Sequence, residues 1–230
     1  YVRLGFAVIA YETDGGIDIT PRTPDKKFAA AVYRYVASYG GLVNARNALE
    51  FAIARFPEIA QDRIFTLGHS SGGRQALVFA AHDERIKGCV TFAPVTELGY
   101  LETAQFNHVP GKRKRMSDAI EATLPISHPG RLKVPTVVYY TSKDKVVSRA
   151  DLRYFARRVG SHAELVEVSG ANHFSLADKS FPQAAKWLCR HAGLNEPDVT
   201  TVSRSKEGEF ERTNLQRSRR KTTLQSNPFL

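Results

Sequence analysis

The sequence predicts an α/β protein with a mostly parallel, doubly wound β-sheet that is covered by helices on both faces. Two observations support this fold class. Continuous apolar runs of strand length recur along the chain, as expected for strands buried on both faces. Between several of them, apolar residues recur every three or four positions, which is the spacing of one helix face. Strands that alternate with helices form βαβ units, whose strands are parallel.

The predicted elements follow in a simple order. The expected strands cover residues 5–11, 63–67, 87–94, 134–141 and 163–169. The expected helices cover residues 41–56, 71–82, 149–159 and 181–192. The stretch 12–27 is rich in Gly, Pro and Asp and is predicted to be a loop, while 95–130 is expected to be irregular with short helices.

Length and composition predict one domain with a tail. The chain has 230 residues, of which 42% are hydrophobic and 24% charged, as in soluble globular proteins. The ordered domain is expected to cover 1–196, and the polar stretch 197–230 is expected to be a disordered basic tail. Because the sequence opens at Tyr1 inside an apolar run, we expect the domain to lack its N-terminal strands. No apolar run approaches the roughly 18 residues of a membrane span.

The net charge of +10 raises the question of a nucleic-acid partner. Basic residues gather in "GKRKR" (111–115) and "RSRRK" (217–221). We favour a solvated terminus over nucleic-acid binding, because the sequence has no zinc-finger spacing, RNA-recognition aromatics or heptads. Cys89 and Cys189 are predicted core residues that form neither a disulfide framework nor a metal site. No signal peptide is recognised, so a cytoplasmic location is the default expectation, and the sequence does not indicate an oligomeric state.

The stretch "IFTLGHSSGG" (64–73) carries the main functional signal. Gly68-His69-Ser70-Ser71-Gly72 matches G-x-S-x-G between a predicted strand and a predicted helix. Such a turn lifts the central side chain clear of the sheet, and glycines two positions away avoid collisions. Ser70 is therefore the candidate nucleophile, and we reject the adjacent His69 as its base because neighbouring side chains on a sharp turn diverge. The alternatives are a closely packed βα turn and a phosphate loop, whose motifs do not fit.

A serine nucleophile needs a base that is oriented by a carboxylate. In this kind of sheet the expected chain order is Ser, then acid, then His, each at a strand end. Asp144 follows the strand 134–141, and His173 follows the strand 163–169. Asp144 could instead pair with Lys143 and Lys145, His173 could be a surface histidine, and Asp178 is held as the reserve acid.

These residues give the chain a resemblance to the α/β-hydrolase superfamily. It is carried over residues 1–192 by the stretches "GFAVIAYETDGG", "DRIFTLGHSSGGRQALVFAAHDERIKGCVTFAPVTEL", "PISHPGRLKVPTVVYYTSKDKVV" and "SGANHFSL". The chain looks most like the catalytic domain of prolyl oligopeptidase-type (S9) serine peptidases and their dienelactone hydrolase-like relatives. The resemblance implies a three-layer α/β-hydrolase fold, the triad Ser70, Asp144 and His173, and a small ester or peptide substrate. It implies no metal and no cofactor.

The chain departs from the S9 pattern in three ways. It has Ser71 where an aromatic residue usually follows the nucleophile, which favours an esterase. It carries no β-propeller ahead of the hydrolase domain. The backbone N–H of Ser71 can supply one oxyanion donor, whereas the loop that supplies the second donor in the family lies upstream of Tyr1. The expected function is therefore serine peptidase or esterase activity, and the alternative is an inactive protein that keeps the fold.

Overall fold

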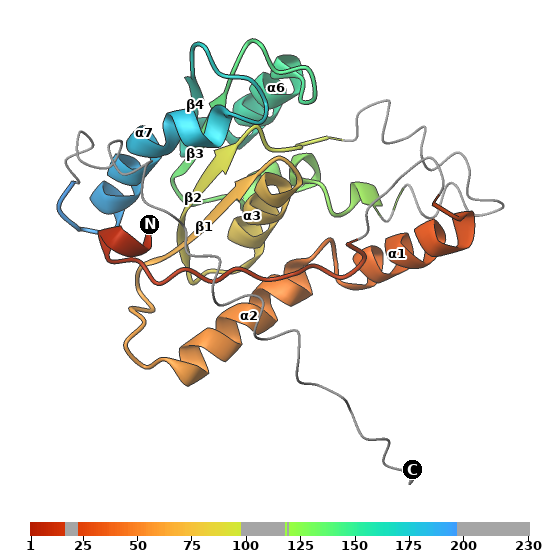
Figure 1. Ribbon diagram of the computed structural model, residues 1–230, viewed down its shortest axis with the longest axis horizontal. Helices are drawn as coiled ribbons and strands as arrows, with labels where there is room; N and C mark the ends of the chain where they lie inside the picture. The colour runs from red at the N-terminus through yellow and green to blue at the C-terminus, as the bar shows by residue number, and fades with distance from the viewer. Residues whose placement is uncertain (17–22, 98–117, 119, 197–230) are drawn as a thin grey trace, which may run out of the picture. The chain divides into compact units, whose positions relative to one another are not determined.

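A computed structural model of the chain describes residues 1–16, 23–97, 118 and 120–196, and Figure 1 shows its ribbon. The described residues contain a four-stranded sheet, all of whose neighbouring strands are parallel. The strands are β1 (Ile64–His69), β2 (Ile86–Phe92), β3 (Thr136–Tyr140) and β4 (Ala163–Glu167), in that spatial order. The predicted tail 197–230 and the basic run 111–115 lie outside the described residues, so the domain boundary stays a prediction.

Helices cover both faces of the sheet, as predicted (Figure 1). One face is covered by α3 (Ser71–His82) and α6 (Arg149–Val159), and the other by α7 (Leu176–His191). The helix α2 (Leu42–Arg55) packs against α3 and buries Ala45 and Leu49 there. The short 3-10 helices are Val2–Leu4, Pro125–Ser127, Pro129–Arg131 and Gly160–His162.

The side chains of the strands divide the core into two parts. Val90 and Phe92 of β2 point to the face that α7 covers, and Cys89 points to the face of α3. Burial raises the pKa of the Cys89 thiol to about 12, so this cysteine is an inert core residue, as predicted. Cys189 is also buried and free.

The helix α6 shows how the sequence sets its bounds. The Ser148 hydroxyl accepts a hydrogen bond from the Asp151 N–H and caps the N-terminus. Leu152, Phe155 and Val159 are spaced three and four apart and are buried in the core. Gly160 then takes a positive φ of 78° at the C-terminal end. The four predicted helices are all present, although α7 begins five residues earlier than predicted.

Two predictions near the N-terminus are wrong. The predicted strand 5–11 does not form, because no described strand offers these residues a hydrogen-bonded ladder; Val8 is 57% and Ile9 42% exposed. Part of the predicted loop 12–27 belongs to α1 (Asp25–Ala37), which begins directly after Pro24. Its buried residue Val32 packs with Ile120.

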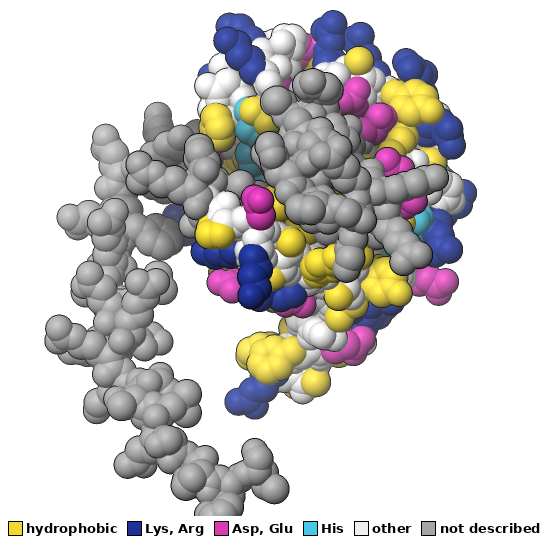
Figure 2. All heavy atoms as spheres, turned by 90° about the vertical axis from the view of Figure 1, so that its right-hand side faces the viewer, with side chains coloured by type: hydrophobic (Ala, Val, Ile, Leu, Met, Phe, Trp, Pro, Cys, Tyr) yellow, Lys and Arg dark blue, Asp and Glu magenta, His cyan; other side chains and the backbone are white. Residues whose placement is uncertain are grey.

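The surface view in Figure 2 bears on the charge of the described residues. On this face the Lys and Arg side chains are interspersed with acidic and hydrophobic ones, and they do not form a continuous basic stripe. An electrostatic footprint for nucleic acid consists of clustered basic side chains on one face. The described part of this face therefore gives no support to nucleic-acid binding.

Candidate active site

Ser70 lies at the sharp turn between β1 and α3. Its backbone has φ 55° and ψ −119°, a strained conformation for a residue with a side chain. The Ser70 N–H donates to the Phe92 carbonyl at 2.9 Å, which ties the turn to the end of β2. This is the strand–turn–helix geometry that the G-x-S-x-G motif predicts.

The glycines around this turn have different roles. A Cβ on Gly68 would overlap the backbone of Gly72, and a Cβ on Gly73 would lie 2.9 Å from the Pro94 Cβ. These two glycines are required by close backbone packing. The prediction that a side chain at Gly72 would collide is wrong, because a Cβ built there has no heavy atom within 4 Å apart from its chain neighbours and the backbone of its own helix.

Asp144 and His173 are joined by a short hydrogen bond. Asp144 lies in the loop after β3, and its Oδ2 is 2.8 Å from the His173 Nδ1. Its other oxygen, Oδ1, accepts from the backbone N–H groups of Val146 at 2.8 Å and Val147 at 2.9 Å. Both side chains are buried, with 4% of Asp144 and 7% of His173 exposed. The carboxylate is therefore fixed by three donors, and it orients the imidazole rather than pairing with Lys143 or Lys145.

The loop that carries His173 is shaped by local polar groups. The Asn172 side-chain oxygen accepts from the N–H groups of Phe174 and Ser175, at 3.1 and 3.0 Å. Thr141, which is buried at the end of β3, donates from its hydroxyl to the Ala171 carbonyl at 3.1 Å. The acid loop and the histidine loop are thus tied to each other below the Asp144–His173 pair.

His69 connects the turn of Ser70 to the loop that carries His173. Its Nε2 lies 2.8 Å from the His173 carbonyl oxygen, and the two imidazole rings have centroids 4.7 Å apart. This places Ser70 directly beside the residue that contacts His173. Among the described residues, no hydrogen bond joins the Ser70 hydroxyl to the His173 ring.

The N-terminus of α3 lies behind Ser70. The first helical N–H groups, beginning with Ser71, have no acceptor within the helix, and the first turn carries the positive end of the helix dipole. The Ser70 carbonyl oxygen accepts hydrogen bonds from the backbone N–H groups of Arg74 and Val95, at 3.1 and 3.2 Å. The turn is therefore held through the Ser70 backbone, while the Ser71 N–H remains a candidate oxyanion donor.

Sequence reasoning missed the supporting residues of this site. Thr141 and Asn172 support the site through hydrogen bonds to the loops. The only feature of the sequence that pointed to them was that they lie close to Asp144 and His173. The Asx-type pattern of Asn172 two residues before Phe174 could have indicated a turn. Asp178 lies in the first turn of α7 and is exposed, so the reserve acid is not the partner of His173.

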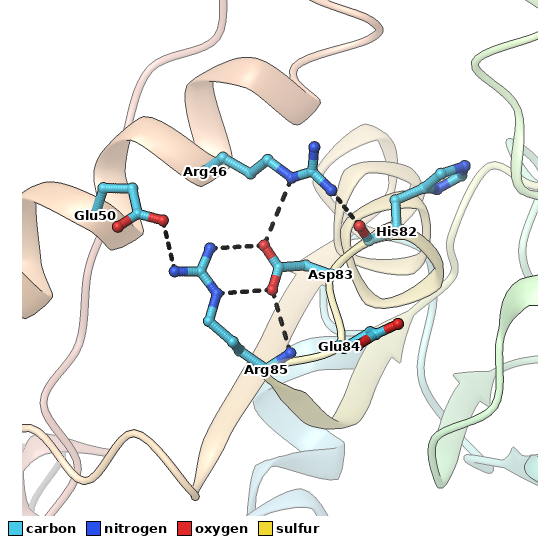
Figure 3. A pocket seen from close by; sticks show the side chains of 6 residues that line it. All are labelled: Arg46, Glu50, His82, Asp83, Glu84 and Arg85. Atoms are coloured by element: carbon cyan, nitrogen blue, oxygen red, sulfur yellow. Dashed lines mark hydrogen bonds and ion pairs between the residues drawn. The ribbon is translucent and has the colours of Figure 1, made fainter.

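A second polar cluster lies at the other end of α3 and lines a surface pocket (Figure 3). The Arg85 guanidinium donates to both oxygens of Asp83 at 2.8 and 2.7 Å and to Glu50 at 2.6 Å. Arg46 donates to the His82 carbonyl and forms an ion pair with Asp83 at 3.5 Å. The hydrogen bond from Arg85 holds the pKa of Asp83 below its usual range. Because these charged groups pair with one another, the cluster holds α2 against the turn before β2.

The described residues contain no group of three or more His, Cys, Asp or Glu side chains that could hold a metal ion. None of the described helices is long and apolar enough to cross a membrane.

No protein-family model and no curated protein matches this sequence. Solved structures do match. The Pyrococcus horikoshii acylaminoacyl peptidase is similar with a TM-score of 0.60 and 13% identity, covering 76% of this chain and 32% of the peptidase. A Mycobacterium tuberculosis puromycin-hydrolyzing peptidase is similar with a TM-score of 0.57 and 16% identity, covering 73% of this chain and 28% of that one.

A third similar structure is a 2,6-dihydroxy-pseudo-oxynicotine hydrolase, with a TM-score of 0.54 and 20% identity. The likeness covers 69% of this chain and 48% of that hydrolase. The chain thus spans less than half the length of each of these three structures. The parallel sheet, its helices and these likenesses give the chain an α/β-hydrolase type of fold, and the solved structures that share it include peptidases and other hydrolases.

Proposed function

We propose that this chain is a serine hydrolase that cleaves ester or peptide bonds through an acyl-enzyme. The observation that carries the proposal is the 2.8 Å hydrogen bond between the Asp144 carboxylate and the His173 Nδ1, beside the strained turn of Ser70. A buried carboxylate on one ring nitrogen leaves the other nitrogen, Nε2, to accept a proton.

The reaction begins with attack of the Ser70 Oγ on the substrate carbonyl carbon. The hydroxyl proton passes to the His173 Nε2, and the tetrahedral oxyanion forms near the Ser71 N–H. Collapse of this intermediate breaks the acyl bond, and the leaving group takes the proton from His173. Water then attacks the acyl-enzyme by the same route and restores the Ser70 hydroxyl. Throughout, Asp144 stabilises the imidazolium and fixes the tautomer of the ring.

The substrate class is an ester or a peptide. The structures of similar fold include peptidases, which supports an S9-like peptidase. Ser71 follows the nucleophile in place of an aromatic residue, which supports an esterase of the dienelactone hydrolase type. A panel of p-nitrophenyl esters and aminoacyl p-nitroanilides separates the two, because a peptidase turns over both kinds of substrate and an esterase only the first. We further propose that residues 1–196 form the hydrolase domain and that 197–230 are a basic tail.

Covalent labelling with a fluorophosphonate probe tests the nucleophile. We expect one label on Ser70, lost in Ser70→Ala and retained in the matched control Ser71→Ala, which keeps the backbone N–H. Circular dichroism and thermal unfolding are used to check that both variants are folded. Labelling that survives Ser70→Ala contradicts the proposal. A folded wild-type chain that takes no label and hydrolyses no member of the panel instead supports an inactive protein with a hydrolase fold.

A further inference from the structure

We propose that His69 is a positioning residue that holds the loop of the catalytic base against the nucleophile turn. The proposal rests on the function proposed above for Ser70 and His173. It is carried by two contacts between residues 104 apart in sequence: the 2.8 Å hydrogen bond from His69 Nε2 to the His173 carbonyl, and the imidazole rings 4.7 Å apart.

The topology of the sheet explains why such a link is needed. Ser70 follows β1 at one edge of the described sheet, whereas His173 follows β4 at the other edge. The histidine loop must therefore reach across the ends of β2 and β3 to meet the nucleophile. His69, the last residue of β1, binds the backbone of His173 itself.

The hydrogen bond also defines the chemistry of His69. A carbonyl oxygen only accepts hydrogen bonds, so the Nε2 of His69 carries the hydrogen and donates it. That nitrogen is committed to the His173 backbone and is unable to take the proton of Ser70. Through this bond His69 acts on the position of the His173 backbone.

Two anchors act on different parts of His173. Asp144 fixes the ring through Nδ1, and His69 fixes the backbone through the carbonyl oxygen. With only the first anchor the ring keeps its tautomer, but the whole loop can move away from Ser70. A misplacement of about 1 Å in a catalytic group can lower the rate about 100-fold. Loss of the hydrogen bond should thus lower kcat, while KM changes little.

Two substitutions separate the hydrogen bond from the ring contact. His69→Gln places an amide N–H at about the position of Nε2 and removes the ring. His69→Phe keeps an aromatic ring and removes the donor. We expect His69→Gln to keep kcat within about tenfold of the wild type, and His69→Phe to lose about 100-fold in kcat with KM nearly unchanged.

The experiment measures p-nitrophenyl ester hydrolysis and the downfield NMR signal of the His173 Nδ1 proton in the full chain. We expect this signal to persist in His69→Gln and to broaden or shift in His69→Phe. Equal kcat values and equal signals in the two variants overturn the proposal. If Ser70→Ala retains activity, the function proposed above fails, and only the NMR signal then tests the positioning role. A signal that is unchanged in His69→Phe overturns this role. A signal that is altered in His69→Phe supports it.

Discussion

Replacing Asp144 with asparagine should perturb the orientation of His173, the proposed catalytic base, with almost no change in the size of the side chain. In the structure, Asp144 Oδ1 accepts from the two backbone N–H groups of Val146 and Val147, and Oδ2 accepts from His173 Nδ1. An asparagine has only one side-chain oxygen, so it can accept either from the two backbone N–H groups or from His173, but not from both. Two backbone donors outweigh one, so the amide oxygen faces the backbone and the NH₂ group faces His173.

The consequence is the wrong histidine tautomer. His173 Nδ1 must accept from the new NH₂ group, which moves the ring hydrogen to Nε2. That nitrogen is then unable to take the proton of Ser70. The same tautomer error in a serine hydrolase lowers kcat on the order of 10⁴-fold, or about 5.5 kcal/mol in activation free energy. Substrate binding does not use this carboxylate, so we expect KM to change little.

The assay is steady-state hydrolysis of p-nitrophenyl esters by Asp144→Asn and by the matched control Asp178→Asn. Asp178 is exposed in the first turn of α7 and should be replaceable with almost no loss of rate. Thermal unfolding checks that both variants are folded. A folded Asp144→Asn that keeps activity within about tenfold of the wild type refutes the reasoning, and so does an equal loss in the control.

Three further predictions concern folding. Gly68→Ala should destabilise the turn severely, because the new Cβ overlaps the Gly72 backbone, whereas Gly72→Ala should be neutral or gain up to about 1 kcal/mol; denaturant unfolding compares them, and equal effects would contradict the packing argument. Phe155→Ala should cost about 3–5 kcal/mol, since this ring is 1% exposed, whereas Phe174→Ala, at 81% exposed, should leave the melting temperature unchanged. Burial lowers the pKa of His82 below its usual 6.5, so below that pH the unfolded chain binds more protons and stability falls; His82→Gln should flatten this loss of stability as the pH falls through about 6.5, and an unchanged slope would count against it.

Local pattern was enough to predict most of the described fold. The strands β1 to β4 are short apolar runs. The helices α2 and α6 have clear helical spacing, and α3 directly follows the turn of Ser70. The stretch 5–11 has the same apolar pattern but forms no strand. A strand exists only where neighbours complete its hydrogen bonds, and sequence pattern does not report neighbours. The helix α1 was missed because Pro24 and the polar residues before it read as a continuous loop.

The order and strand-end positions of the candidate site were also predictable. Gly68, Ser70 and the order of Asp144 and His173 follow from the motif and from the ends of parallel strands. The partner of His69 was not predictable, because it is the backbone of a residue 104 positions away. Any residue type at position 173 supplies that carbonyl oxygen, so the contact leaves no pattern in the sequence. The role of Gly72 was misjudged for the same reason, since the open space beside it is a tertiary feature.

The most direct test of the central claim is to find where an acyl group attaches during turnover. Acid quench of the p-nitrophenyl acetate reaction, followed by peptide mapping with mass spectrometry, locates the acetyl group. The proposed mechanism predicts one acetyl group on Ser70, absent from Ser70→Ala and slow to form in Asp144→Asn. Acetyl groups that appear on another side chain at the rate of turnover, with Ser70 unmodified, would contradict it.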